Sequence, residues 1–187
     1  MDSDVSEHFE HAEHAEHAAH SGNPFLAKVS VTIAILAVIA ATVGSLETVE
    51  SGKAISDKNE SVLLQNKATD RWAFFQAQTI KKNMYDIASA SNPAKAGDFD
   101  TKARGYEKEG AEIRSQAEDL EKDRDAKLED SERHEHRHHT LTTGVTMLHV
   151  SIAVATIAII MSGKRWPWYS AMVLGGLGTI VAATAYL

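Results

Sequence analysis

The segment 134–139, with the sequence HEHRHH, carries the spacing in this chain that is most typical of a catalytic centre. In the pattern HExxH, here His134, Glu135 and His138, two histidines one helical turn apart bind zinc and the glutamate acts as a base on zinc-bound water. A catalytic zinc also needs a third protein ligand. No Asp or Glu follows Glu135, and the only histidine after His139 is His149, inside an apolar run. We therefore expect no catalytic residue here, and peptidase activity is the weakest of three functional hypotheses.

A second group of histidines lies near the start of the chain, in the repeat EHFEHAEHAEHAAH. Positions i and i+3 are neighbours on a helix, so adjacent imidazoles and the interleaved glutamates could share a divalent metal. The alternative is a solvated acidic tail that binds nothing. No other cofactor is expected, and the candidate metal ligands are His8, His11, His14, His17 and His20.

The composition limits the classes of protein and partner that need to be considered. The chain has 187 residues and a net charge of -7, which gives no reason to expect nucleic-acid binding. It has no cysteine, so disulfides and thiolate metal sites are excluded. Only three prolines interrupt a sequence rich in Ala, Glu, Lys and Asp, which favours an all-α fold.

Three apolar runs, 29–46, 141–161 and 169–187, contain no Asp, Glu, Lys or Arg. Each has about 20 residues, the length that crosses a bilayer core of about 30 Å. We therefore expect three transmembrane helices, at 26–46, 141–161 and 169–187, with membrane lipid as a partner. The short loop 162–168 between the last two carries Trp166 and Trp168, aromatic residues typical of the membrane interface.

The residues between the first two spans, 47–140, are expected to form a long antiparallel helical hairpin outside the membrane. Asn92-Pro93 and Gly97-Asp98 are its strong helix breakers, which place the tip near 91–98. The two arms on either side of this tip have nearly the same length. The segment 1–25 before the first span is the His- and Glu-rich acidic tail.

Both arms of the hairpin show the alternating four- and three-residue spacing of a coiled coil. On the returning arm the seam is Phe99, Ala103, Tyr106, Gly110, Ile113, Ala117 and Leu120. On the outgoing arm the same spacing joins Ile55, Asn59, Val62, Asn66, Thr69, Ala73, Gln76, Ile80, Asn83 and Ile87.

A second apolar stripe on the outgoing arm comprises Leu64, Ala68, Trp72 and Phe75. It indicates either a wide hairpin core or a face that packs against another protomer or partner. Small residues four apart in the spans, among them Ala171, Gly175, Thr179 and Ala183, and Ala37, Ala41 and Ser45, allow close helix contact within or between subunits. We expect a homo-oligomer, with contact residues Leu64, Trp72, Phe75, Ala171, Gly175 and Thr179.

The segment DRWAFFQAQTIKKNMYDIA, residues 70–88, resembles the bacterial family known as domain of unknown function 4337. The resemblance extends from about Asn23 through SGKRWPWYSAMVLGGLG. It implies a bacterial membrane protein with two spans toward the end and a charged helical insert. It implies no activity.

Two features of the spans bear on location and transport. Lys28, Lys164 and Arg165 favour a cytoplasmic N-terminus in a multi-pass protein of the bacterial inner membrane, while Arg133 and Arg137 favour the opposite orientation. His149 lies inside the second span, either bonded to a neighbouring helix or on an ion path, but no charged residue accompanies it.

The leading hypothesis is therefore a non-enzymatic membrane protein that assembles with itself, or with an unidentified membrane partner, through its hairpin. The alternative is a metal- or pH-responsive accessory of a transport system that uses the histidine tail.

Overall fold

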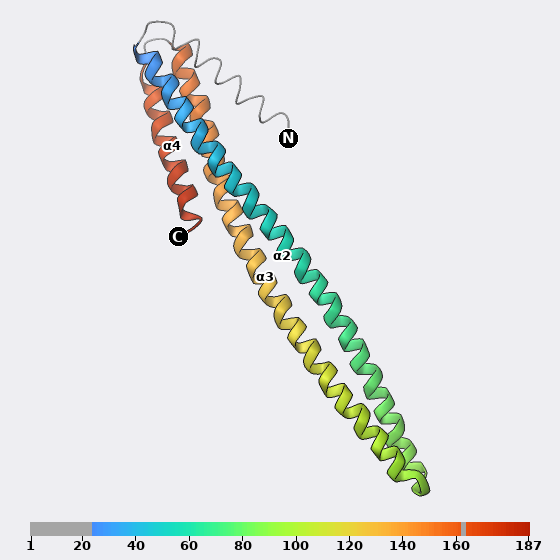
Figure 1. Ribbon diagram of the computed structural model, residues 1–187. Coiled ribbons are helices and arrows are strands. Elements are labelled where there is room, and N and C mark those ends of the chain that lie inside the picture. The colour runs from blue at the N-terminus through green and yellow to red at the C-terminus, as the bar shows by residue number, and fades with distance from the viewer. Residues whose placement is uncertain (1–23, 162–163) are drawn as a thin grey trace. The chain divides into compact units, whose positions relative to one another are not determined.

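The computed structural model describes residues 24–161 and 164–187. These residues form three long α-helices and one short 3-10 helix (Figure 1): α2 at Pro24–Ser91, η1 at Pro93–Lys95, α3 at Ala96–Ile160 and α4 at Trp166–Thr184. No strand occurs within the described ranges. The prediction of an all-α chain is confirmed.

A proline sets the end of α2. Asn92 has φ -135° and ψ 82°, because the residue before a proline is kept out of the helical region. α2 therefore ends at Ser91, and the chain turns through η1 into α3 at Ala96.

The chain divides into two compact units, which are described separately. Among the described residues, unit 1 comprises 24–53 and 133–187, and unit 2 comprises 54–132. In unit 2, α2 and α3 lie side by side and antiparallel (Figure 1). Lys127 Nζ lies 3.3 Å from Asp57 Oδ1 near the open end of this pair, and Ser89 Oγ donates to Asp100 Oδ1 at 2.6 Å near the tip.

The interior of unit 2 follows the predicted seam on α3. Ala103, Gly110, Ile113 and Ala117 are buried, and Phe99, Tyr106 and Leu120 are half-buried. Near the tip, Tyr85 of α2 stacks on Tyr106 with ring centroids 5.6 Å apart. The assignment of these α3 residues to an interior seam is confirmed.

The assignment of the seam on α2 was wrong. All ten residues that the sequence placed there are exposed, including Ile80 and Ile87 at 60% and 67%. The face that lies against α3 instead carries buried Ser61, Ala68 and Gln78 and half-buried Trp72 and Phe75. Small residues let the helices approach closely, and polar ones find partners across the contact, as when Gln78 Nε2 donates to Glu109 Oε2 at 3.2 Å.

Unit 1 is a three-helix arrangement with small residues inside. α4 contributes buried Ala171, Gly175, Gly178 and Ala182, and it meets Gly144 of α3 so closely that a Cβ on Gly178 would lie 3.0 Å from the Gly144 carbonyl oxygen. The core also includes Val29, Ile33, Leu36, Ala40 and Val43 of α2 with Leu141, Leu148, Ile152, Ala155 and Ala158 of α3.

The predicted stripes of small residues follow the structure only in part. Ala171 and Gly175 are buried, but the next members, Thr179 and Ala183, are exposed and are replaced by Gly178 and Ala182. In the first span, Ala41 and Ser45 are likewise exposed. The reason is the helical repeat of 3.6 residues, since successive steps of four drift away from a contact that alternating steps of four and three follow.

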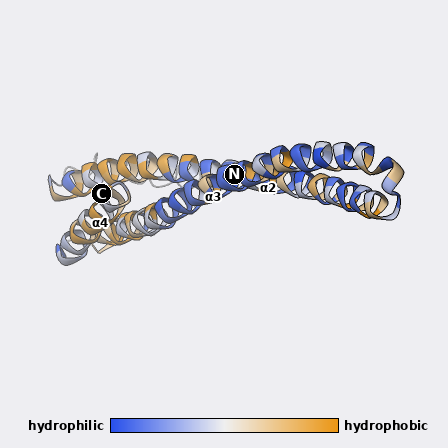
Figure 2. Ribbon diagram, turned by 90° about the horizontal axis from the view of Figure 1, so that it is seen from below, coloured by the Kyte–Doolittle hydropathy of each residue, from blue (hydrophilic) through white to orange (hydrophobic). Residues whose placement is uncertain are grey.

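The helices of unit 1 are apolar on the outside as well. Figure 2 shows hydrophobic residues along all three helical segments, whereas hydrophilic residues prevail along unit 2. α2 and α3 each contain a stretch long and apolar enough to cross a membrane. Among the described helices α4 falls short of that measure, because its first four residues are aromatic or proline.

Candidate functional site

A buried carboxylate forms the centre of the most polar cluster in unit 1. Glu50 of α2 is only 3% exposed. Its Oε2 lies 2.5 Å from His134 Nδ1 on α3, its Oε1 accepts a hydrogen bond from the Tyr186 hydroxyl at 3.3 Å, and Lys53 Nζ lies 3.6 Å away. These four residues form what we call the Glu50 cluster, and they come from α2, α3 and the segment after α4.

The surroundings of Glu50 favour its ionised form. Burial by itself raises the pKa of a carboxyl group, but the hydrogen bond with His134, the charge of Lys53 and the hydrogen bond from Tyr186 together lower the pKa of Glu50 below its ordinary value. A carboxylate is therefore held inside the unit with its oxygens occupied by donors.

A second polar layer lies one turn away from the Glu50 cluster. The Thr142 hydroxyl donates to Glu47 Oε1 at 2.6 Å, and His138 Nδ1 lies 3.7 Å from the same oxygen. The Arg137 guanidinium lies over the Tyr186 ring, 5.3 Å from its centroid. Both layers join helices through donors and acceptors on side chains.

The structure places the two histidines of the HExxH pattern on one face of α3 and the glutamate on another. His134 and His138 face carboxylates of α2, whereas Glu135 is exposed and lies 3.9 Å from His139 Nε2 on its own helix. Within the described ranges, no three Asp, Glu or His side chains come together in a group that could hold a metal ion. The arrangement of His134 and His138 serves contacts between helices.

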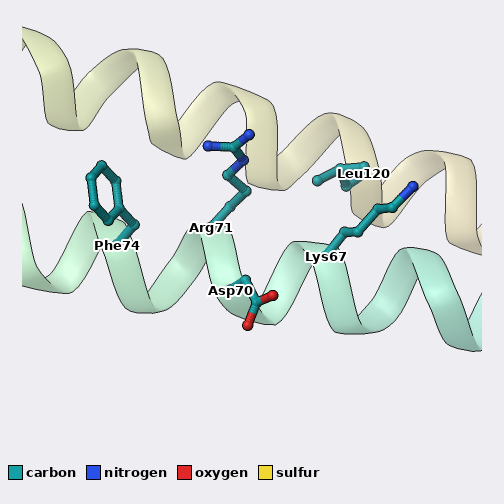
Figure 3. A pocket seen from close by; sticks show the side chains of 5 residues that line it. All are labelled: Lys67, Asp70, Arg71, Phe74 and Leu120. Atoms are coloured by element: carbon teal, nitrogen blue, oxygen red, sulfur yellow. The ribbon is translucent and has the colours of Figure 1, made fainter.

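Unit 2 contains an open groove of about 580 Å³ on one side of α2. Figure 3 shows Lys67, Arg71 and Phe74 on the side of α2 that faces α3, with Leu120 of α3 as the opposite wall, while Asp70 points away. Neither Lys67 nor Arg71 forms an ion pair within the part of the chain that the structure describes. Two cations beside an aromatic ring are groups that bind carboxylates or phosphates.

The predicted contact residues fall into three places. Trp72 Nε1 donates to Glu121 Oε1 at 2.9 Å, Phe75 packs against Gly110, and Leu64 is half-buried, so these three lie within unit 2. Ala171 and Gly175 lie inside unit 1, and Thr179 is exposed. The candidate metal ligands His8, His11, His14, His17 and His20 lie outside the described residues.

Sequence reasoning missed Glu50 and Tyr186. A signal for Glu50 existed, since the buried positions Val29, Ile33, Leu36, Ala40 and Val43 alternate steps of four and three, and two further steps reach Glu47 and Glu50. No pattern along the chain points to Tyr186, which joins the cluster only through tertiary packing.

Comparison with known proteins gives a family and no activity. The model of the family described as Domain of unknown function (DUF4337) matches residues 25–187. The comparisons with curated proteins and with solved structures found no match. A functional conclusion must therefore come from the geometry of the two units.

Proposed function

This chain belongs to the family described as Domain of unknown function (DUF4337), and we propose that it is a non-enzymatic scaffold of the bacterial inner membrane. In this proposal it crosses the membrane three times, at 26–46, 141–161 and 169–187. The residues between the first two spans form a hairpin that assembles with further copies of the chain.

The observation that carries the membrane assignment is the distribution of side chains in unit 1. Its interior holds small residues such as Ala155, Ala171 and Gly175 beside larger ones, yet large apolar residues such as Val38, Ile160 and Val173 also point outward and are 64–77% exposed. A soluble bundle covers its outer surface mainly with polar residues. Membrane helices are apolar on the outside as well, because lipid covers them, and close packing of small residues holds the helices together.

The aromatic residues at one end of unit 1 support the same placement. Trp168 Nε1 donates to the Thr32 hydroxyl at 3.0 Å, and Phe25 meets the Trp168 ring edge to face at 6.0 Å. Arg165 lies over the Phe25 ring. Aromatic rings with adjacent cations are typical of the level of lipid head groups. The cations Arg165, Lys28 and Lys164 favour a cytoplasmic N-terminus.

The hairpin supports assembly because α2 leaves large apolar side chains uncovered in unit 2. Ile55, Val62 and Ile80 are each more than half exposed. In a hairpin surrounded by water, these exposed side chains cost free energy that contact with a second copy recovers. The histidines with catalytic spacing support a non-enzymatic role, since His134 binds Glu50, His138 faces Glu47 and Glu135 points away from both histidines.

The proposal is tested by purifying the full chain into nanodiscs and measuring its mass by multi-angle light scattering. One chain has a mass of 20.3 kDa, and we expect the protein mass in each disc to be two or more times this value. Parallel extraction of cell membranes with alkaline carbonate should leave the protein in the pellet. A single chain per disc contradicts assembly, and release by carbonate contradicts the spans.

A further inference from the structure

Ten of the exposed positions of α2 in unit 2 form one continuous stripe along the helix. They follow alternating steps of four and three, so they stay on one face of a helix that supercoils with a neighbour. We call this face the outer stripe: Ile55, Asn59, Val62, Asn66, Thr69, Ala73, Gln76, Ile80, Asn83 and Ile87.

The outer stripe carries no charge on a strongly charged unit. The α2 segment 54–91 contains nine Asp, Glu, Lys and Arg, and none of them occupies the stripe. The α3 segment 96–132 contains twenty, and the only large apolar residue exposed on it is Leu128. An uncharged surface on α2 over more than 30 residues is the surface that a second helix can cover without burying charges.

The membrane limits how two copies can meet through this surface. Copies inserted with the same topology present α2 in the same direction and at the same level, so two outer stripes that meet run parallel. A two-fold axis then places each residue opposite its own counterpart. Ile80 meets Ile80, and Asn66 meets Asn66.

The residue types of the stripe suit such a pairing with itself. An asparagine amide both donates and accepts hydrogen bonds, so two Asn66 side chains satisfy each other across a two-fold axis. In register each asparagine of the stripe meets its own counterpart, whereas a shift by one heptad leaves Asn66 of one chain opposite Ala73 of the other. A partner of unrelated sequence has no reason to match asparagines at 59, 66 and 83.

From these observations we propose that two copies of the chain pair through their outer stripes, with the two α2 helices parallel and in register. This inference rests on the assembly proposed above and specifies its surface and partner. The stripe contributes to the dimer contact, and the Trp72 side of α2 remains packed on α3 of the same chain.

Disulfide formation tests the pairing, because the chain has no natural cysteine. Val62→Cys, Asn66→Cys and Ile80→Cys are prepared one at a time in the full chain, and Ser115→Cys on the exposed face of α3 is the matched control. After mild oxidation in nanodiscs, we expect several-fold more disulfide-linked dimer from each stripe variant than from the control. A disulfide requires Cα atoms within about 7 Å, so it reports direct pairing.

Register is tested by mixing two variants that carry different affinity tags. Val62→Cys and Ile80→Cys lie about 27 Å apart along a helix, so a parallel, in-register pair forms only homotypic disulfides. Abundant mixed disulfides between positions 62 and 80 would indicate antiparallel helices and overturn the inference.

Light scattering on the same samples separates this inference from the proposed function. A dimer or larger assembly in which Ser115→Cys cross-links as well as the stripe variants overturns the stripe contact and leaves assembly intact. A single chain in each disc overturns both. Cross-linking of the stripe in native membranes to a protein of another mass shows a different occupant and also overturns the inference.

Discussion

At the scale of single residues, the stability of unit 1 depends most on Glu50. It is a buried carboxylate that binds His134 of α3 and Tyr186 after α4, and it lies close to Lys53 of its own helix. Loss of its charge leaves the donors around it with a weaker acceptor, which is costly in a buried site. The Glu50 cluster therefore contributes stability that depends on ionisation.

We predict that Glu50→Gln lowers the free energy of unfolding by about 1–3 kcal/mol at pH 7. The lowered pKa of Glu50 means that its contribution is present above the ordinary value of 4.5 and is lost as the pH falls through the lower pKa of the folded state. Parent and variant should therefore differ in thermal unfolding at pH 7 and converge under acidic conditions. Circular dichroism in nanodiscs at a series of pH values measures this.

Glu135→Gln is the matched control, because Glu135 is exposed on the same polar segment of unit 1. Its unfolding temperature should stay within one degree or two of the parent at pH 7, since exposed ion pairs contribute little. An equal fall in unfolding temperature for Glu50→Gln and Glu135→Gln would contradict a special role for Glu50.

At the scale of elements, the contact between α3 and α4 depends on two glycines. A Cβ on Gly178 would lie 3.0 Å from both the Gly144 carbonyl oxygen and Met147 Cβ, whereas a Cβ on Gly176 would meet nothing within 4 Å. Gly178 lies where the two helices touch, and Gly176 lies two residues earlier, on the open side of α4.

We predict that Gly178→Ala destabilises unit 1 by about 1–3 kcal/mol, because a backbone atom of α3 must move to admit the methyl group. Gly176→Ala should be neutral or stabilise the helix by up to about 1 kcal/mol, since alanine favours helix more than glycine does. Thermal unfolding of both variants in the same detergent provides the comparison. A Gly178→Ala protein as stable as the parent would show that α4 does not pack on α3 as closely as the 3.0 Å distance implies.

The two seams show how far helix contacts could be predicted from the sequence. On α3 the predicted seam was right, because its small and apolar residues stand among charged ones and leave one choice of face. On α2 two stripes have helical spacing, and the strict alternation of four and three selected the wrong one. The contact actually uses Ala68, with Gln78 and Trp72 satisfied by partners across the helix pair.

At the scale of the whole molecule, helix limits and fold class follow from local signals. Asn92-Pro93 and the apolar runs indicate them without tertiary information. The Glu50 cluster did not follow, because Tyr186 is far from Glu50 in sequence and only packing unites them. The HExxH pattern was easy to notice because its residues are close in sequence, but its two histidines face Glu50 and Glu47 in the structure.

The histidine tail provides the last prediction, which concerns metal uptake by the full chain. Among the described residues His134 and His138 face Glu50 and Glu47, and no group of three side chains there could hold a metal. The repeat at His8, His11, His14, His17 and His20 instead offers several imidazoles with carboxylates between them.

We therefore expect calorimetry to show zinc binding by the intact protein and none by a variant that lacks residues 1–22. Imidazole ligands follow the general order of metal affinities, so copper and nickel should bind at least as tightly as zinc. Binding should weaken as the pH falls below about 6.5, since protonated imidazole is not a ligand. Equal uptake by the two proteins would place the metal elsewhere and remove the tail from any metal-responsive role.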